Sequence, residues 1–285
     1  MSLVVTGASG HLGRLTVQAL LDRGVEPHRV VAAARTPDRL ADLAARGVDV
    51  RRADYDDPQS LKDAFAGATR VLLVSSSAVG ARLDQHRNVV EASRDAGVDL
   101  LAYTSIAGAG TTSMLLAADH VATEQLIRES GLPYVFLRNA WYLENYTEQI
   151  PTAREHHAVL GSAGTGRVSA ATRADYAAAA AAVLAGDGPR NHAYELGGDQ
   201  AFTLAEYAET LSALVGETIG YVDQPEAEYR AFLESVGVPA PMAEILADAD
   251  AAVGRGDLLV ETGDLARLTG RPTTGLADAI RSALA

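Results

Sequence analysis

The first half of the chain alternates short apolar runs with longer amphipathic segments rich in alanine and leucine. The apolar runs lie at 2–6, 29–34, 48–53, 70–76, 99–105 and 134–139, and the amphipathic segments lie at 12–23, 37–46, 58–66, 84–96 and 118–130. Strands that alternate with helices of this length predict right-handed βαβ units and a parallel sheet covered on both faces. The pattern therefore predicts an α/β fold built on a doubly wound parallel Rossmann sheet.

This alternation stops near residue 145. Beyond it, the sequence predicts helices at 172–186 and 203–216, strands at 192–198 and 219–223, and mostly helical structure from 225 to 284. We expect a Rossmann domain at 1–145 and a smaller C-terminal α/β annex at 146–285, interleaved with the first domain. The annex is expected to close over the carboxyl edge of the sheet, where ligands of such folds bind.

The composition argues against several kinds of site and partner. The 285 residues include no cysteine, which excludes disulfides, iron–sulfur clusters and thiolate nucleophiles. A net charge of −13 argues against a nucleic-acid partner. No run is long and apolar enough to span a bilayer, and "MSLVVTGASG" carries no secretory leader. We therefore expect a cytoplasmic protein with no membrane partner and no metal, and the sequence leaves a homodimer open.

A glycine-rich stretch, "TGASGHLG" at 6–13, follows the first predicted strand and opens the first predicted helix. A dinucleotide fingerprint has this location, because its glycines allow a tight turn, close approach of a pyrophosphate and close packing of helix on strand. The helix N-terminus adds N–H groups and the positive end of a dipole. A purely structural turn is the alternative, but the context favours a nucleotide site.

The end of the second predicted strand indicates which nucleotide binds. A free ribose 2′-hydroxyl usually meets an Asp or Glu there, whereas "VVAAARTPDR" has Arg35. A guanidinium suits a 2′-phosphate, and such a contact contributes on the order of 1.5–3 kcal/mol. We therefore expect NADP as cofactor, with NADPH preferred over NADH. The alternative is an exposed arginine that only ends the strand.

The ends of the next two predicted strands carry further candidates. Asp54 and Tyr55 follow the third strand and either flank the adenine or form a turn. The stretch "SSSAVGAR" follows the fourth strand, from Ser75 to Arg82. Small hydroxyl residues at this edge can lie beside a cofactor without crowding it, and Arg82 could reach a phosphate, although serines also suit a loop exit.

These stretches, together with "LRNAWYLENY" at 137–146 and "ATRADY" at 171–176, resemble the NmrA-like branch of the short-chain dehydrogenase superfamily. More narrowly, they resemble the bacterial flavin-free NAD(P)H:quinone oxidoreductases of that branch. The resemblance runs from residue 3 to about 283. It implies an enzyme that uses NADPH without flavin or metal and whose partner is a small quinone.

The resemblance also implies residue roles. It assigns the pyrophosphate to Gly7, Ser9, Gly10, His11 and Leu12, the 2′-phosphate to Arg35, and the cofactor lining to Ser75, Ser76, Ser77, Arg82 and Thr104. Around the nicotinamide and acceptor it implies Asn139, Trp141, Tyr142, Asn145 and Tyr146, with Arg173 closing the site from the annex side. Two alternatives stay open, in which Trp141 is a core anchor and Arg173 pairs with Asp175.

The alcohol-oxidising members of the superfamily carry a Tyr-x-x-x-Lys pair on the helix after the fifth strand, where this chain has His120 and Glu124. Keto–alcohol chemistry without a positioned acid would lose roughly 10²–10⁴-fold in rate. Quinone reduction tolerates the loss, because a hydroquinone anion is less basic than an alkoxide and can take its proton from water. His120 either donates a proton or forms a structural hydrogen bond to Glu124. Our catalytic candidates are Asn145, which would position the reactants, with His120 and Tyr146.

The sequence thus favours an NADPH-dependent reductase that passes hydride directly from nicotinamide to a quinone. Two alternatives remain. One is a redox sensor that binds NAD(P) and regulates a transcription-factor partner without turnover, which the missing Tyr/Lys pair permits. The other is a reductase of other conjugated carbonyls or azo compounds. The complete "LRNAWYLENY" stretch and the annex favour the enzyme over the sensor.

Overall fold

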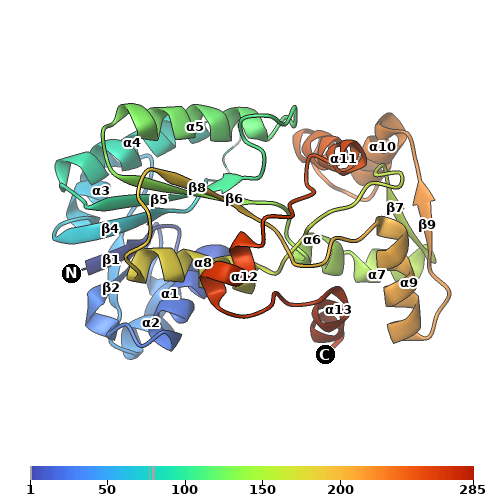
Figure 1. Cartoon of the computed structure of the whole chain (residues 1–285), viewed down its shortest axis with the longest axis horizontal. Helices are drawn as coiled ribbons and strands as arrows, with labels where there is room; N and C mark the ends of the chain where they lie inside the picture. Colours follow the sequence, from blue (N-terminus) through green and yellow to red (C-terminus); the bar gives the residue numbers. More distant parts are fainter. Residues whose placement is uncertain (1, 77, 79–80) are drawn as a thin grey trace.

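The computed structural model describes residues 2–76, 78 and 81–285. Within this part of the chain, seven parallel strands form the central sheet in the order β3-β2-β1-β4-β5-β6-β8 (Figure 1). They are β1 (Ser2–Val5), β2 (Val30–Ala34), β3 (Asp49–Arg52), β4 (Ala68–Leu73), β5 (Leu100–Ile106), β6 (Tyr134–Asn139) and β8 (His192–Leu196). The predicted doubly wound Rossmann sheet is confirmed, and the strand order reverses between β1 and β4, where such sheets form a ligand crevice.

Helices cover both faces of this sheet (Figure 1). One face carries α1 (His11–Asp22), α2 (Ala41–Ala45), α8 (Arg173–Ala185) and α12 (Asp264–Thr269), and the other carries α3 (Pro58–Ala64), α4 (Arg82–Asp95) and α5 (Ala117–Glu129). Short 3-10 turns, η1 (Pro27–Arg29) and η2 (Pro37–Leu40), flank β2. Alternate residues of β1 serve the two cores: Leu3 and Val5 pack on the α1 side, and Val4 packs on the α3–α5 side. This alternation explains why central strands such as β1 and β2 carry apolar residues on both faces.

Two elements from the second half of the chain belong to the Rossmann part of the fold. Strand β8 pairs in parallel with β6, and the alanine-rich helix α8 packs against α1 beneath the sheet. Small side chains such as Ala177 and Ala181 allow the two helices to approach closely. The division at 145/146 stays a prediction about domains, and the structure adds that residues beyond it supply an outer strand and a covering helix.

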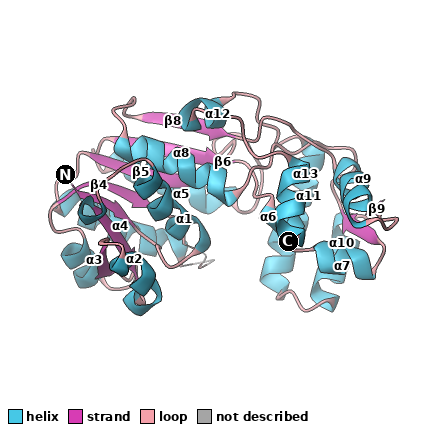
Figure 2. Ribbon diagram, turned by 90° about the horizontal axis from the view of Figure 1, so that it is seen from below, coloured by secondary structure: helices cyan, strands magenta, loops and turns pink. Residues whose placement is uncertain are grey.

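The remaining elements gather at one end of the molecule, beyond the carboxyl ends of the strands (Figure 2). They are α6 (Glu144–Thr147), α7 (Ile150–Glu155), β7 (Ala158–Gly161), α9 (Leu204–Val215), β9 (Gly220–Asp223), α10 (Glu226–Ser235), α11 (Ala240–Arg255) and α13 (Leu276–Leu284). Strands β7 and β9 form a separate parallel pair, and α9 begins with a capping box formed by Thr203 and Glu206. No helix in the described residues is long and apolar enough to cross a membrane.

Candidate active site

The loop between β1 and α1 has the geometry of a phosphate cradle. Gly7 adopts a φ of +59°, which L-amino acids with side chains rarely adopt, and its carbonyl accepts the Gly10 N–H at 2.9 Å. A Cβ atom on Gly13 would overlap the carbonyl of Gly7, so the start of α1 can lie against the loop only without a side chain there. Gly10, the N-cap of α1, provides no side-chain cap. The first N–H groups of the helix are therefore available to an anion.

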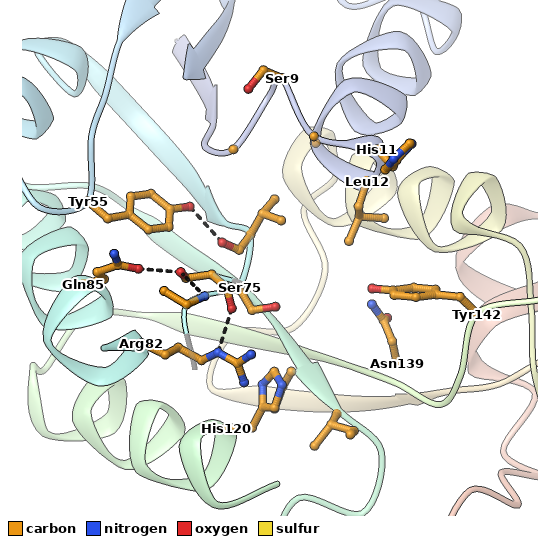
Figure 3. A pocket seen from close by; sticks show the side chains of 18 of the residues that line it. Ser9, His11, Leu12, Tyr55, Ser75, Arg82, Gln85, His120, Asn139 and Tyr142 are labelled. Carbon is orange, nitrogen blue, oxygen red and sulfur yellow. Dashed lines mark hydrogen bonds between the residues drawn. The ribbon is translucent and has the colours of Figure 1, made fainter. Parts of the chain in front are cut away.

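A cavity of about 630 Å³ opens beside this loop, at the carboxyl ends of β1, β4, β5 and β6 (Figure 3). Most of the residues predicted from the sequence line this central cavity: Gly7, Ser9, Gly10, His11, Leu12, Arg35, Ser75, Ser76, Arg82, His120, Asn139, Trp141 and Tyr142. The other lining residues are Gly13, Arg39, Ala53, Asp54, Tyr55, Val74, Ala78, Gln85, Ser105, Ile106, Leu116 and Ala140. The volume lies within the range of roughly 300–1,000 Å³ that is typical of small-molecule and cofactor sites.

Several predicted residues lie elsewhere. Thr104 is buried, and its Oγ1 accepts the N–H of Ser75 at 2.8 Å, so it supports the cavity from behind. Asn145 and Tyr146 line a smaller second cavity, whose wall shares Trp141 with the central cavity. Ser77 lies outside the described residues. The roles of these residues stay predictions.

Arg173 approaches the central cavity from behind Tyr142. Its guanidinium carbon lies 5.2 Å from the centroid of the Tyr142 ring, and its Nη2 donates to Asn145 Oδ1 at 3.2 Å. Its ion pair is with Glu148, at 2.6 Å, and Asp175 instead pairs with Arg271 at 2.7 Å. The alternative in which Arg173 pairs with Asp175 is therefore wrong.

Two arginines lie at the end of the cavity that the second strand forms. Arg35 follows β2 directly, and Arg39 lies on η2; both side chains are exposed and line the cavity. Because β2 and β3 pair in parallel up to Ala34 and Arg52, Tyr55 is brought to the same end. Arg39 was not among the candidates from the sequence, although its position four residues after Arg35 is a signal that it could share the same end of the cavity.

The loop after β4 is held by α4 (Figure 3). The N–H of Ser76 donates to Nε2 of His86 at 3.0 Å, its hydroxyl donates to Gln85, and its carbonyl accepts from Nε of Arg82 at 2.7 Å. Burial, followed by the charge of Arg82, lowers the pKa of His86 to about 3, which agrees with a neutral ring that accepts the Ser76 N–H. These contacts fix Ser75, Ser76 and Arg82 as one wall of the cavity.

His120 lines the same wall from α5. Its Nδ1 lies 2.7 Å from the hydroxyl of Tyr103, a fully buried residue of β5. Burial, followed by the charge of Arg82, lowers the pKa of His120 to about 3, so the imidazole is neutral near neutral pH. The sequence alone leaves open a hydrogen bond between His120 and Glu124. The structure pairs the two residues differently, because Glu124 accepts from other side chains.

Glu124 belongs to a buried ionic network beneath the cavity. Its carboxylate accepts from Ser105 Oγ at 2.7 Å and from Arg138 Nη2 at 2.6 Å, and Arg138 also donates to Glu195 at 2.9 Å. The hydrogen bonds from Arg138 to both carboxylates raise its pKa against the opposing effect of burial. The network joins the carboxyl ends of β5, β6 and β8 to α5, and it fixes Ser105, which lines the cavity.

Two buried polar atoms on cavity-lining residues lack hydrogen-bond partners among the described residues. They are Nη1 of Arg82 and Oδ1 of Asn139. Buried polar groups are nearly always paired, so such atoms are typical of a site that a ligand completes. The phosphate cradle and the exposed arginines fit a phosphorylated dinucleotide, and the two unpaired atoms mark the rest of the cavity as a site that binds a polar ligand group. No group of three His, Asp or Glu residues that could hold a metal ion occurs in the described part of the chain.

Known proteins of similar sequence and fold include some whose crystal structures hold a nicotinamide cofactor. The NAD(P)H-binding family matches residues 7–187. Quinone oxidoreductase 2 of Escherichia coli (strain K12) is 43% identical over 278 residues, which are 98% of this chain and 97% of that protein. The crystal structure of an NADPH-dependent quinone oxidoreductase from Escherichia coli, complexed with NADPH, matches with a TM-score of 0.96 and 42% identity, covering 99% of this chain and 100% of that one.

A second solved structure is also similar over its full length. The triphenylmethane reductase of Citrobacter sp., complexed with NADP(H), matches with a TM-score of 0.94 and 38% identity, covering 99% of this chain and 100% of that one. The matches extend through the annex as well as the nucleotide-binding sheet. This chain therefore belongs to the NAD(P)H-binding family.

Proposed function

We propose that the protein is an NADPH-dependent reductase that transfers hydride directly from nicotinamide to a quinone. The observation that carries this proposal is the central cavity, which extends from the glycine loop and Arg35 to the aromatic wall of Trp141 and Tyr142. One cavity can thus hold a dinucleotide and bring a flat acceptor against it. The similarity to Escherichia coli quinone oxidoreductase 2 over nearly the whole chain supports the choice of acceptor.

The cofactor would be held by backbone N–H groups and arginine side chains that line the central cavity. The N–H groups at the start of α1, in the loop from Gly7 to Leu12, would bind the pyrophosphate. Arg35 and Arg39 would bind the 2′-phosphate, and this contact favours NADPH over NADH. When bound, the cofactor supplies a hydride from C4 of its nicotinamide ring.

The protein itself would contribute chiefly by holding the nicotinamide and the quinone in position and by excluding water. Tyr142 and Asn139 border the cavity on the annex side, and Arg173 supports the Tyr142 ring from behind. The neutral His120 has no readily released proton near neutral pH, and burial raises the pKa of Tyr103 behind it. The proton that completes the hydroquinone would therefore come from water.

Other conjugated acceptors form a second candidate class of substrate. The likeness to a triphenylmethane reductase supports it, because that protein shares the fold and 38% identity. A wall made of Trp141, Tyr142, Ile106 and Leu116 suits any flat, conjugated molecule of similar size. Quinones and dyes would compete for the same cavity.

The proposal is tested by following NADPH absorbance with purified, flavin-free protein and a panel of quinones, azo compounds and triphenylmethane dyes. We expect many equivalents of NADPH to be consumed with simple quinones. A protein that binds NADPH, consumes none with any acceptor and captures a partner protein only in one cofactor redox state would be a sensor, and the reductase proposal would be wrong.

A further inference from the structure

Arg82 is a buried cation whose pairing is incomplete. Only 6% of its side chain is exposed, and its Nε donates to the carbonyl of Ser76 at 2.7 Å. Nη1 is buried and finds no hydrogen-bond partner among the described residues. Its ion pair with Asp119 spans 3.8 Å, longer than a hydrogen bond, and the carboxylate is 37% exposed to water. Burying an unpaired N–H costs free energy, and an anion that accepts a hydrogen bond from it would offset this cost.

The position of Arg82 separates it from the phosphate-binding part of the cavity. Figure 3 shows Arg82 and His120 on one wall, with Ser9, His11 and Leu12 of the glycine loop on the opposite wall. The charge of Arg82 acts on both His120 and His86 and helps to keep these rings neutral. Among the described residues of α4 and α5 that line the cavity, Arg82 is the one cation, beside the neutral imidazole of His120; Asp119, its partner at 3.8 Å, is not a lining residue.

We propose that Arg82 is a catalytic residue that stabilises the oxygen of the acceptor as it becomes negatively charged. This inference rests on the proposed quinone reduction. The quinone takes up a hydride, with its two electrons, and becomes a hydroquinone monoanion; a proton from water then gives the neutral hydroquinone. A cation in a pocket with little water interacts more strongly with that anion than with the neutral quinone, so it lowers the barrier.

This role also accounts for the missing Tyr-x-x-x-Lys pair. In alcohol chemistry the product oxygen is strongly basic and needs a proton donor. Here the oxygen needs only charge stabilisation, which a fixed guanidinium supplies without a proton transfer. The roles are then divided, because Arg35 and Arg39 serve the cofactor phosphate and Arg82 serves the acceptor.

The first test compares Arg82→Gln and Arg82→Lys with Arg87→Gln, an exposed arginine on the same helix that does not line the cavity. We expect Arg82→Gln to lower kcat/KM for quinones on the order of 10- to 100-fold, since hydrogen bonds to charged groups have this strength. Arg82→Lys should recover part of the loss, and Arg87→Gln should match wild type. The dissociation constant for NADPH should stay unchanged in all three variants.

A series of substituted quinones makes the test specific. The loss in Arg82→Gln should grow as the hydroquinone anion becomes more basic, because more charge then needs stabilisation. A uniform loss across the series, or a rise in the NADPH dissociation constant that matches the loss, would show instead that Arg82 holds the cofactor. If Arg82→Gln fails to fold, the same trend is sought in Arg82→Lys.

A binding experiment gives a readout without turnover. We would titrate protein loaded with NADP⁺ with 4-nitrophenol and follow the phenolate absorbance. The wild type should bind the phenolate and lower its apparent pKa, and Arg82→Gln should not. Turnover by wild type with equal rates in Arg82→Gln would overturn only the role of Arg82. Arg82-dependent phenolate binding without any quinone turnover would overturn only the proposed function.

Discussion

The hydroxyl of Tyr103 lies 2.7 Å from Nδ1 of His120, and both side chains are buried where β5 meets α5. His120 stands on the helix that carries the catalytic tyrosine of alcohol-oxidising relatives of this fold. Burial lowers its pKa to about 3, and its ring is tied to a tyrosine whose own pKa is raised. Near neutral pH, neither member of the pair releases a proton easily. The pair thus shapes the wall of the cavity and leaves proton supply to water.

His120→Ala should therefore lower kcat for quinone reduction only modestly, by about tenfold or less, because the hydroquinone anion needs little help with its proton. Steady-state kinetics and an NADPH titration of the variant check this, with the exposed Val121→Ala as the control on the same helix. A loss of several orders of magnitude, with folding and NADPH binding intact, would show that His120 is the acid.

The free energy of unfolding should fall as pH is lowered from about 6.5 towards 3. His86 and His120 have pKa values of about 3 in the folded protein, against an ordinary histidine value of 6.5, so the unfolded chain binds more protons in this window. Each histidine then contributes a slope of up to about 1.4 kcal/mol per pH unit. Denaturant unfolding at several pH values measures it. His120→Gln should reduce the slope, and an unchanged slope would mean that His120 is not buried as a neutral ring.

Arg35→Asp should weaken NADPH binding far more than NADH binding. The contact with the 2′-phosphate is charge-assisted, so its removal costs about 1.5–3 kcal/mol, and the new carboxylate adds repulsion. Calorimetric titration of wild type and variant with both cofactors checks this. Arg190→Asp, in an exposed loop at the opposite edge of the sheet, is the matched control. Equal losses for NADPH and NADH would show that Arg35 does not read the phosphate.

Asn145→Ala should lower kcat/KM for quinones, whereas Glu209→Ala on the exposed face of α9 should not. The Asn145 amide is fixed by Arg173, and that arginine supports the Tyr142 ring at the wall of the central cavity. The substitution should therefore act on the position of the reactants and leave the unfolding free energy nearly unchanged. Equal kcat/KM in wild type and Asn145→Ala would remove Asn145 from the catalytic candidates.

Much of the fold follows from local patterns in the sequence. The apolar runs at 2–6, 29–34 and 134–139 correspond to β1, β2 and β6 of the central sheet. They could be recognised because a doubly wound sheet buries both faces of its strands, which therefore read as apolar runs. Strand β7 (Ala158–Gly161) was missed. This strand is only four residues long, which is too short to show a clear alternation of apolar and polar residues. Its partner β9 is distant in sequence, so the pairing cannot be recognised from the local sequence either.

The cavity wall was also largely predictable, since parallel strands place their carboxyl ends together. The direction of individual side chains was not. Asn139, Trp141 and Tyr142 reach the central cavity, but the chain then turns into the short helix α6, and Asn145 and Tyr146 face the second cavity instead. The order of residues in "LRNAWYLENY" does not show that the chain turns there. The partnership of His120 with Tyr103 likewise depends on how α5 packs on β5.

Direct hydride transfer to a quinone is tested most directly by an isotope experiment. Flavin-free protein would be mixed with a quinone and NADPH that carries deuterium at C4 of the nicotinamide, in either stereochemical position, under single-turnover conditions. We expect rapid oxidation of the cofactor without added flavin, slowed by deuterium in only one of the two positions. Oxidation that requires added flavin, or no oxidation by protein that binds NADPH, would contradict direct hydride transfer.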